Sequence, residues 1–154
     1  MIFKRKNKNP ERKIIDATSE KKLEFGFTSE YEIQIILKQD SKWNKKFHLK
    51  CIFDTGADIS FVPCRIKEKL KIPTEFKMPV KGISPSKDCK IIVDVGRLKF
   101  KIIDDTGSVS SAFDAWCGFY PFKKGPTLLG MKSVLDKIGF HQDPNDDKLI
   151  LTVP

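Results

Sequence analysis

The chain carries an acid at the point where an apolar strand pattern stops, in the segment FDTGADISF that begins at Phe53. Apolar and polar residues alternate before this acid, Asp54, and apolar character resumes at Ile59. A carboxylate held at the edge of a core costs free energy unless hydrogen bonds or a function compensate. Gly56 and Ala57 are small enough for backbone amides to approach the acid. The sequence therefore predicts a loop that holds a carboxylate with a controlled proton.

The same tripeptide recurs at Asp105, Thr106 and Gly107, in the segment DDTGSVSS. This copy lies between KFKII and SSAFDAW, which have the pattern of two antiparallel strands. Asp, Thr and Gly suit a connecting turn, in which glycine supplies a positive φ. We therefore expect Asp105 to be a turn residue and Asp54 to be the residue that does chemistry.

The elements that would position Asp54 are mainly β. Alternation and β-branched residues predict strands over 31–37 and 46–53, joined by a polar turn over 39–45. Alternating arms on both sides of GISPS, residues 82–86, predict a hairpin. A further strand pair is expected to begin at Gly96, and a last hairpin is expected from GFHQ and KLILTV. The predicted fold class is a small, mainly β domain.

Two short helices complete this prediction. Pro63 suits the start of a helix over CRIKEKL, in which Ile66 and Leu70 lie on one face. The segment MKSVLDKI has apolar residues at positions i, i+3, i+4 and i+7, and Gly139 can end the helix that this spacing predicts.

Length and charge bound the organisation of the chain. Its 154 residues suffice for one domain, and the 40% apolar content fits a folded protein. Many of the basic residues behind the net charge of +9 fall within residues 1–22, which we expect to be a flexible, solvated extension of a domain over 23–154. This extension has no interleaved aromatics, so nucleic acid is not an expected partner, although contact with phosphate or an anionic membrane stays open.

The cysteines and apolar runs indicate the compartment. The four cysteines are widely spaced and only His48 and His141 could join them, so we expect no metal and no cofactor, and reduced thiols. No apolar run approaches the roughly 18 residues of a membrane span, and the start MIFKRKNKNP lacks the apolar core of a signal peptide. We expect a soluble, cytoplasmic protein with no membrane span.

The stretch IFDTGADIS resembles the active-site loop of the retropepsin-like aspartic proteases, in which two apolar residues precede Asp, Thr or Ser, Gly and Ala. The second signature of that family is two apolar residues and a glycine that open a helix near the C-terminus. Leu128, Leu129 and Gly130 stand in that place here. A short helix, a hairpin flap around GISPS and a strand pair lie between the signatures in the family's order. The resemblance covers roughly residues 30 to 153.

This resemblance implies a small, closed, β-barrel-like acid protease fold, a homodimer, and hydrolysis of peptide bonds in extended polypeptide segments. Aspartic proteolysis needs two carboxylates that share one proton. The second Asp-Thr-Gly is only 105 − 54 = 51 residues further on, too near to belong to a second lobe. A twofold dimer would supply Asp54 twice, with LILTV as the expected interface strand.

The resemblance also assigns roles to individual residues. Asp54 would be catalytic, while Thr55 and Gly56 would support the active-site loop, the Thr55 hydroxyl by bonding into a neighbouring loop. Asp58 would contact the substrate backbone, with capping of the turn as its alternative role. The residues expected to bind substrate are Ala57, Asp58, Gly82 and Ile83.

Two departures from the retroviral pattern are visible. Gly82 is followed by Ile83, Ser84 and Pro85 where retroviral members carry a glycine-rich flap tip, and Met131 stands where they carry an arginine. In both respects the chain is more similar to cellular retropepsin-like domains, such as those of DNA-damage-inducible proteins. The alternative function is a catalytically silent binding or dimerisation module. Such a module would be expected to lose the aspartate or the Gly-Ala pair, and both are present.

Overall fold

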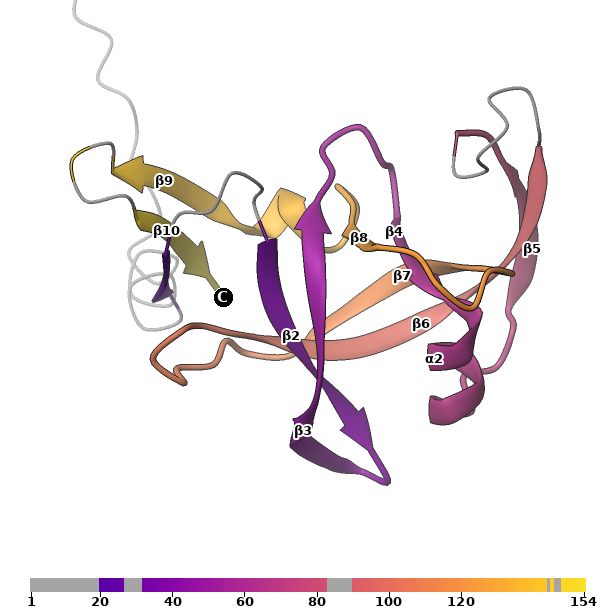
Figure 1. Ribbon diagram of the computed structural model, residues 1–154, viewed down its shortest axis with the longest axis horizontal. Helices are drawn as coiled ribbons and strands as arrows, with labels where there is room; N and C mark the ends of the chain where they lie inside the picture. Colours follow the sequence, from indigo (N-terminus) through magenta and orange to yellow (C-terminus); the bar gives the residue numbers. More distant parts are fainter. Residues whose placement is uncertain (1–19, 27–31, 83–89, 144, 146–147) are drawn as a thin grey trace, which may run out of the picture.

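The computed structural model describes residues 20–26, 32–82, 90–143, 145 and 148–154 (Figure 1). These residues form ten strands, one α-helix and one 3-10 helix: β1 (Lys21–Gly26), β2 (Glu32–Gln39), β3 (Lys42–Phe53), β4 (Ser60–Pro63), α2 (Cys64–Leu70), β5 (Phe76–Val80), β6 (Ile91–Ile103), β7 (Phe113–Tyr120), β8 (Thr127–Leu129), η1 (Leu135–Lys137), β9 (Gly139–Asp143) and β10 (Lys148–Val153). None of the helices in these ranges is long and apolar enough to span a membrane.

Six strands close into a barrel in the order β2–β3–β8–β4–β7–β6, because β6 also pairs with β2. The length of β6 makes this closure possible. Its first part pairs with β5 and β7, and its residues 100–103 pair with β2. Apolar side chains of these strands fill the interior, among them Ile33, Ile35, Leu37, Leu98, Phe100 and Ile102. The predicted fold class, a mainly β closed barrel, is confirmed.

Gly96 lies inside β6, whereas the sequence led us to expect a strand beginning there. The ladder continues through it, and Gly96 pairs with Cys117 of β7. A Cβ atom at Gly96 would meet the carbonyl oxygen of Pro73 at 2.7 Å. Glycine is therefore needed here because the chain after α2 crosses close to the strand, and not because the strand is interrupted.

The first predicted helix is confirmed as α2, which buries Ile66 and ends at Lys71 in the left-handed region, with φ of 53°. The polar turn expected over residues 39–45 is shorter than predicted. Asp40 and Ser41 both have positive φ and make a tight turn, so that β3 begins at Lys42. The polar residues after Lys42 are strand residues on an exposed end of the hairpin.

The second predicted helix is wrong. Turns follow Gly130, and only Leu135–Lys137 forms a helical element, a single 3-10 turn. Ser133 has φ of 68° and Val134 has φ of −128° and ψ of −80°, which are outside the α-helical region. The apolar spacing still predicted burial, since Val134, Leu135 and Ile138 are buried.

A three-stranded sheet, β1–β10–β9, lies beside the barrel (Figure 1). Its buried residues, including Leu23, Leu149 and Leu151, belong to the same core cluster as the barrel interior. β10 is the middle strand and is paired on both sides. Both hydrogen-bonding edges of β10 are thus used within the chain, and the expectation that LILTV is an interface strand stays a prediction.

Strand β1 begins at Lys21, so Lys21 and Lys22, which we expected in the basic extension, are strand residues paired with β10. Residues 1–19, the rest of the expected extension, lie outside the described residues.

The second Asp-Thr-Gly forms the turn between β6 and β7, as the sequence predicted. Gly107 has φ of 89° and Asp105 is exposed. The preceding acid, Asp104, is 8% exposed and organises the turn. One carboxylate oxygen of Asp104 accepts from the Thr106 amide at 2.9 Å, the Thr106 hydroxyl at 2.7 Å and the Ser108 amide at 2.8 Å.

The other carboxylate oxygen of Asp104 accepts from the Glu24 amide at 3.2 Å and so ties the turn to β1. Burial alone would disfavour the charge of Asp104. The hydrogen bonds from Thr106, Glu24 and Ser108 outweigh that cost and hold the pKa of Asp104 below its ordinary value. The contribution of this charge to stability is thus present above the unfolded pKa, near 4, and is lost as pH falls through the folded pKa.

Replacing Asp104 by Asn should lower the free energy of unfolding at pH 7 by about 1–3 kcal/mol, because the amide nitrogen would face the Glu24 amide donor. The difference from wild type should shrink as the pH falls below about 4, where the wild-type carboxylate also protonates. Denaturant unfolding at several pH values measures both effects. Asp105→Asn is the matched control and should change stability by less than about 0.5 kcal/mol. A pH-independent loss for Asp104→Asn would contradict the charged role.

Candidate active site

The loop after β3 holds the carboxylate of Asp54 by its own backbone. The amide of Gly56 donates to Oδ1 of Asp54 at 3.0 Å, and the amide of Ala57 donates to the Asp54 carbonyl at 3.2 Å. The Asp54 amide donates to the carbonyl of Leu129 at 3.0 Å. Asp54 is half-buried. The loop thus fixes the position of the carboxylate and leaves part of it accessible.

Strand β8 lies between the two strands that this loop connects. It runs parallel to β3, with Phe53 opposite Leu129, and antiparallel to β4, with Phe61 opposite Leu128. The two sequence signatures are therefore neighbours in space, although the sequence separates them by more than seventy residues.

The segment after β8 closes over the other side of the loop. The Met131 amide donates to the Ala57 carbonyl at 2.9 Å and the Lys132 amide donates to the Asp58 carbonyl at 2.8 Å. The amide of Gly130 donates to the hydroxyl of buried Ser60 at 3.1 Å. These bonds join residues 130–132 to the Asp54 loop and to Ser60, the first residue of β4, so the two segments are held together.

Gly130 has no room for a side chain. A Cβ atom there would lie 2.3 Å from the carbonyl oxygen of Ile59 and 2.8 Å from that of Ala57. Both atoms belong to the backbone of the active-site loop and cannot rotate away. The glycine is required because the two backbones touch.

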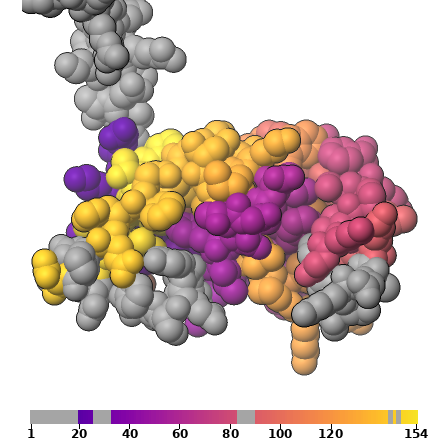
Figure 2. All heavy atoms as spheres, turned by 90° about the horizontal axis from the view of Figure 1, so that it is seen from above, coloured from indigo at the N-terminus to yellow at the C-terminus, as the bar shows by residue number. Residues whose placement is uncertain are grey.

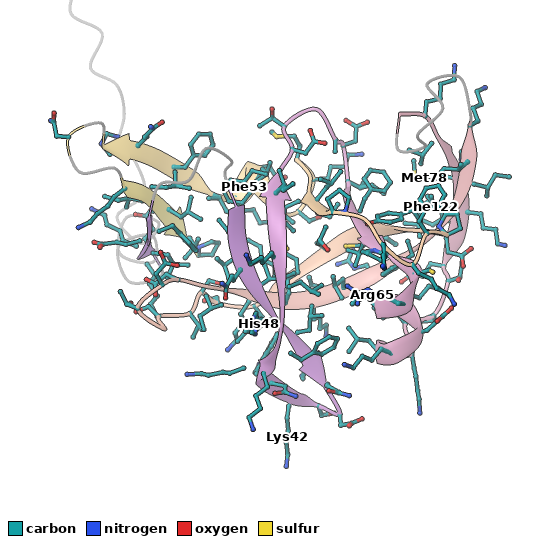
Figure 3. All side chains as sticks on the ribbon, viewed as in Figure 1. Lys42, His48, Phe53, Arg65, Met78 and Phe122 are labelled. Atoms are coloured by element: carbon teal, nitrogen blue, oxygen red, sulfur yellow. The ribbon has the colours of Figure 1, made fainter. Side chains whose placement is uncertain are left out.

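A groove of about 730 Å³ extends from the Asp54 loop to β5 and to the chain after β7. Its walls are largely apolar. Figure 3 shows Met78 of β5 and Phe122 lying near each other on one side of it. The lining residues are Asp54, Gly56, Ala57, Asp58, Ile59, Phe61, Met78, Pro79, Val80, Lys81, Gly82, Tyr120, Phe122, Lys124, Gly125, Pro126 and Leu128.

The groove brings together most of the residues that the sequence singled out. Asp54 and Gly56 line it, as do the three predicted substrate-binding residues Ala57, Asp58 and Gly82. Thr55 is exposed and stands beside the groove, not among its lining residues. Ile83, the remaining predicted residue, lies outside the described part of the chain.

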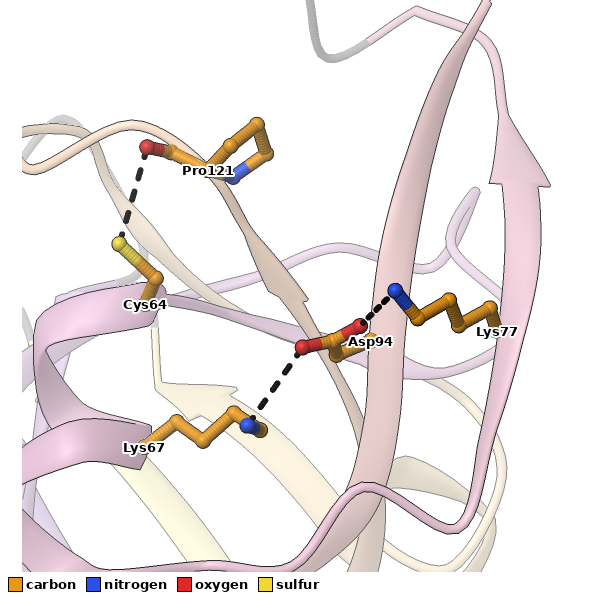
Figure 4. A network of polar contacts seen from close by, with 5 residues as sticks. All are labelled: Cys64, Lys67, Lys77, Asp94 and Pro121. Carbon is orange, nitrogen blue, oxygen red and sulfur yellow. Dashed lines mark hydrogen bonds and ion pairs between the residues drawn. The ribbon is translucent and has the colours of Figure 1, made fainter.

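Sequence reasoning missed the wall formed by residues 121–126. The hydroxyl of buried Tyr120 donates to the Pro126 carbonyl at 2.6 Å, and burial raises the pKa of Tyr120 to about 12. At the first residue of this segment, the Cys64 thiol contacts the Pro121 carbonyl at 3.6 Å (Figure 4). Only a glycine fits at position 125, because a Cβ atom there would lie 2.7 Å from the Tyr120 hydroxyl oxygen and φ is 154°. Aromatic and glycine content alone did not signal this contact.

Asp94 of β6 supports the wall formed by β5. Its carboxylate lies 3.4 Å from the Lys67 ammonium of α2 and 3.5 Å from the Lys77 ammonium of β5 (Figure 4). Partial burial opposes the charge, but the two lysines and a hydrogen bond from Thr74 hold the pKa of Asp94 below its ordinary value.

In the described part of the chain, Cys64 and Cys117 are free thiols, and burial raises the pKa of Cys117. Within the same ranges, no cluster of three or more His, Cys, Asp or Glu side chains is arranged to hold a metal ion.

No protein-family model matches the sequence, and no curated protein does. Solved structures do match. A retropepsin-like aspartic protease from Rickettsia conorii superposes with a TM-score of 0.57 at 17% identity, over 87% of this chain and 92% of that one. A foamy viral protease–reverse transcriptase in complex with an RNA/DNA hybrid gives 0.45 at 20% identity, over 69% of this chain and 12% of that one. The EIAV protease with the inhibitor HBY-793 gives 0.38 at 18% identity, over 70% and 88%.

The Rickettsia match, together with the barrel and the β8 crossing described above, establishes the fold. This chain has the fold of the retropepsin-like aspartic proteases. The resemblance that the two sequence signatures carried is confirmed at the level of fold.

The contact at Gly130 gives a test of how the site is held. Gly130→Ala should lower the free energy of unfolding by about 3 kcal/mol, since the new methyl group overlaps backbone that cannot move without displacing Asp54. Gly139→Ala is the matched control, because its Cβ would meet only Thr152 at 3.5 Å, and it should change stability by less than about 1 kcal/mol. Chemical denaturation compares the two. Equal stabilities for both variants would show that the loop is not fixed by this contact.

Proposed function

We propose that the protein is an aspartic endopeptidase in which two copies of the chain each contribute Asp54 to one catalytic dyad. The observation that carries the proposal is a half-buried carboxylate that accepts a hydrogen bond from the Gly56 amide and lines a largely apolar groove. The lining of the groove includes residues of β4 and of β5 up to Val80, and we propose that an extended peptide binds along it.

The chemistry follows from two carboxylates at close range. Like charges so near each other cannot both ionise, so the pair holds one proton. The ionised member takes a proton from water, which attacks the scissile carbonyl carbon, while the protonated member donates to the carbonyl oxygen. Both apparent pKa values belong to the pair and not to either residue.

A single described chain supplies half of this arrangement. The carboxylates that line its groove are Asp54 and Asp58. The Asp58 carbonyl accepts from the Lys132 amide, and this bond fixes the backbone of Asp58. Asp58 also lines the groove, which accords with a role in positioning substrate. A twofold axis beside Asp54 would bring the second Asp54 to the first, and exposed Thr55 would stand at that axis with its hydroxyl available to the partner loop.

Exposed apolar residues near the Asp54 loop support a surface for the second copy. Met131 is 39% exposed and is bound to the loop through Ala57, while Phe140 of β9 is 58% exposed. β9 is an edge strand of its sheet. In Figure 2, which looks onto the upper side of Figure 1, the C-terminal segment and the chain around residue 55 form one continuous face. We call Thr55, Met131 and Phe140 the dimer face and propose it in place of the LILTV strand that the sequence favoured.

The alternative is a binding or dimerisation module that keeps the fold without turnover. The intact Asp54 loop and the open groove favour the enzyme, because a silent module has no need of a carboxylate held against the core edge. A cytoplasmic location, which the sequence led us to expect, stays part of the proposal and is consistent with the free thiols of Cys64 and Cys117.

Asp54→Asn should abolish cleavage of a peptide library while the fold and the dimer persist, because an amide cannot accept a proton from water. The loss should be at least about 1,000-fold in kcat/KM, the scale expected when a group that acts only in the transition state is removed. Asp105→Asn should cleave at nearly the wild-type rate, since Asp105 is an exposed turn residue. An inactive Asp105→Asn with an active Asp54→Asn would reverse the assignment.

Mixing the chains tests the shared dyad separately. When Asp54→Asn chains exchange into wild-type protein, residual activity should follow the square of the wild-type fraction, because a heterodimer holds one acid and one amide. Mass-tagged chains verify that exchange has occurred. A linear dependence would mean that each chain works alone, and the dyad would be rejected.

Phe140→Glu tests the dimer face. A buried, unpaired charge at the centre of an interface should raise the dimer dissociation constant by more than about 30-fold, which corresponds to a cost of about 2 kcal/mol or more. Sedimentation at several concentrations measures this constant without reference to activity. Ile92→Glu, at a residue 67% exposed on β6, is the control and should leave the constant unchanged. A Phe140→Glu protein that sediments as wild type would place the interface elsewhere.

A further inference from the structure

Both tryptophans of the chain lie on the outer surface of the barrel, each beneath a cation. The Lys101 ammonium lies 4.8 Å from the centre of the Trp43 ring and that of Lys38 lies 5.9 Å from it. The Arg97 guanidinium lies 4.7 Å from the Trp116 ring. These are distances at which a cation is attracted to an aromatic face.

Strand pairing places these residues on one face. Lys38 is opposite Trp43 in the β2–β3 ladder, and Arg97 is opposite Trp116 in the β6–β7 ladder. Between them, β6 buries its alternate residues Leu98, Phe100 and Ile102, so that Arg97, Lys99 and Lys101 point outward. The residues that we call the aromatic–cation face are Lys38, Trp43, Arg97, Lys99, Lys101 and Trp116.

The cations of this face form a regular row. Successive outward residues on one strand are roughly 6.7 Å apart, twice the rise per residue. Asp114 pairs with Arg97 at 3.0 Å. Lys38, Lys99 and Lys101 form no ion pair with any residue in the described ranges, so their charge is available to a ligand.

None of the residues of the aromatic–cation face lines the groove. His48, which lies on this outer side opposite Ile36, and Lys42 are at the β2–β3 end of the molecule in Figure 3, away from Met78 and Phe122 of the groove. A ligand on this face would therefore leave the Asp54 site open.

We propose that the aromatic–cation face binds single-stranded nucleic acid, with phosphates at Lys38, Lys99 and Lys101 and bases against Trp43 and Trp116. A row of cations interleaved with aromatic rings is the chemistry that holds a single strand without reading its sequence. Its tryptophans are half-buried, so they do not project as membrane anchors would. A base that stacks on either ring takes the place of the cation now over it, and that cation then pairs with a phosphate.

This partner differs from what the sequence led us to expect. The basic extension showed no aromatic interleaving, and the interleaving found here arises only when β2, β3, β6 and β7 are paired. The proposal concerns a surface outside the groove lining and does not depend on the proposed protease activity.

Fluorescence anisotropy of labelled oligo(U) and oligo(dT) of about 12 nucleotides, titrated with the full chain, measures binding. Contact with three phosphates predicts an affinity that falls roughly 20-fold between 50 and 200 mM salt. The triple variant Lys38→Gln, Lys99→Gln, Lys101→Gln should weaken binding at least about 10-fold. The matched triple Lys22→Gln, Lys123→Gln, Lys137→Gln removes the same charge from exposed positions elsewhere and should weaken it less than about 3-fold.

Trp43→Leu separates stacking from charge. It keeps apolar bulk and net charge, and it should weaken binding by about 5-fold or more if a base lies on the ring. Circular dichroism verifies that each variant is folded.

Three outcomes would overturn the proposal. Equal losses in the two lysine triples would mean that net charge alone attracts the oligonucleotide. Loss of binding on deletion of residues 1–19, with the face variants unaffected, would move the site to the extension. Binding to anionic phospholipid vesicles that depends on the face, with no oligonucleotide binding, would identify a membrane surface instead.

Discussion

The structure depends on one close contact, the backbone of Gly130 against the carbonyl groups of Ala57 and Ile59. This contact lets β8 lie between β3 and β4, and that crossing supplies the bond from the Asp54 amide to Leu129. Without it, β3 and β4 would have no common neighbour, and the barrel would open between them. The position of the carboxylate and the closure of the sheet are therefore one constraint and not two.

The two Asp-Thr-Gly copies show how local chemistry can be shared while its consequence differs. In the first copy, Asp54 accepts from the amide two residues further on, that of Gly56. In the second copy, Asp104, the residue before the tripeptide, takes this role and accepts from the Thr106 amide. Asp104 has its oxygens occupied by four donors and serves the fold. Asp54 keeps part of its carboxylate toward a groove, which is the condition for acting on a ligand.

The sequence predicted what depends on period and on local turn chemistry. Period-two patterns gave β2, β3 and the hairpins, and Pro63 with its following spacing gave α2. The predictions fail where a close approach of two backbone segments or an unusual φ decides the conformation. Gly96 was predicted to begin a strand, but it lies inside β6 where the Pro73 carbonyl passes close to it. The segment MKSVLDKI has helical spacing, but the positive φ of Ser133 is incompatible with an α-helix. The sequence does not show that the Pro73 backbone lies above Gly96 or that Ser133 takes a left-handed conformation, so neither outcome could be derived from it.

The same limit explains why part of the site and all of the aromatic–cation face escaped sequence reasoning. The lining by Tyr120, Phe122 and Pro126 depends on where the β7–β8 connection returns across the barrel. Trp43 and Trp116 are seventy-three residues apart (116 − 43 = 73) and share a face only because β6 pairs with β2 as well as with β7. The long strand that closes the barrel thus buries Phe100 on one side and presents Lys99 and Lys101 on the other. Barrel closure, which the core requires, is also what gathers scattered cations into a single surface.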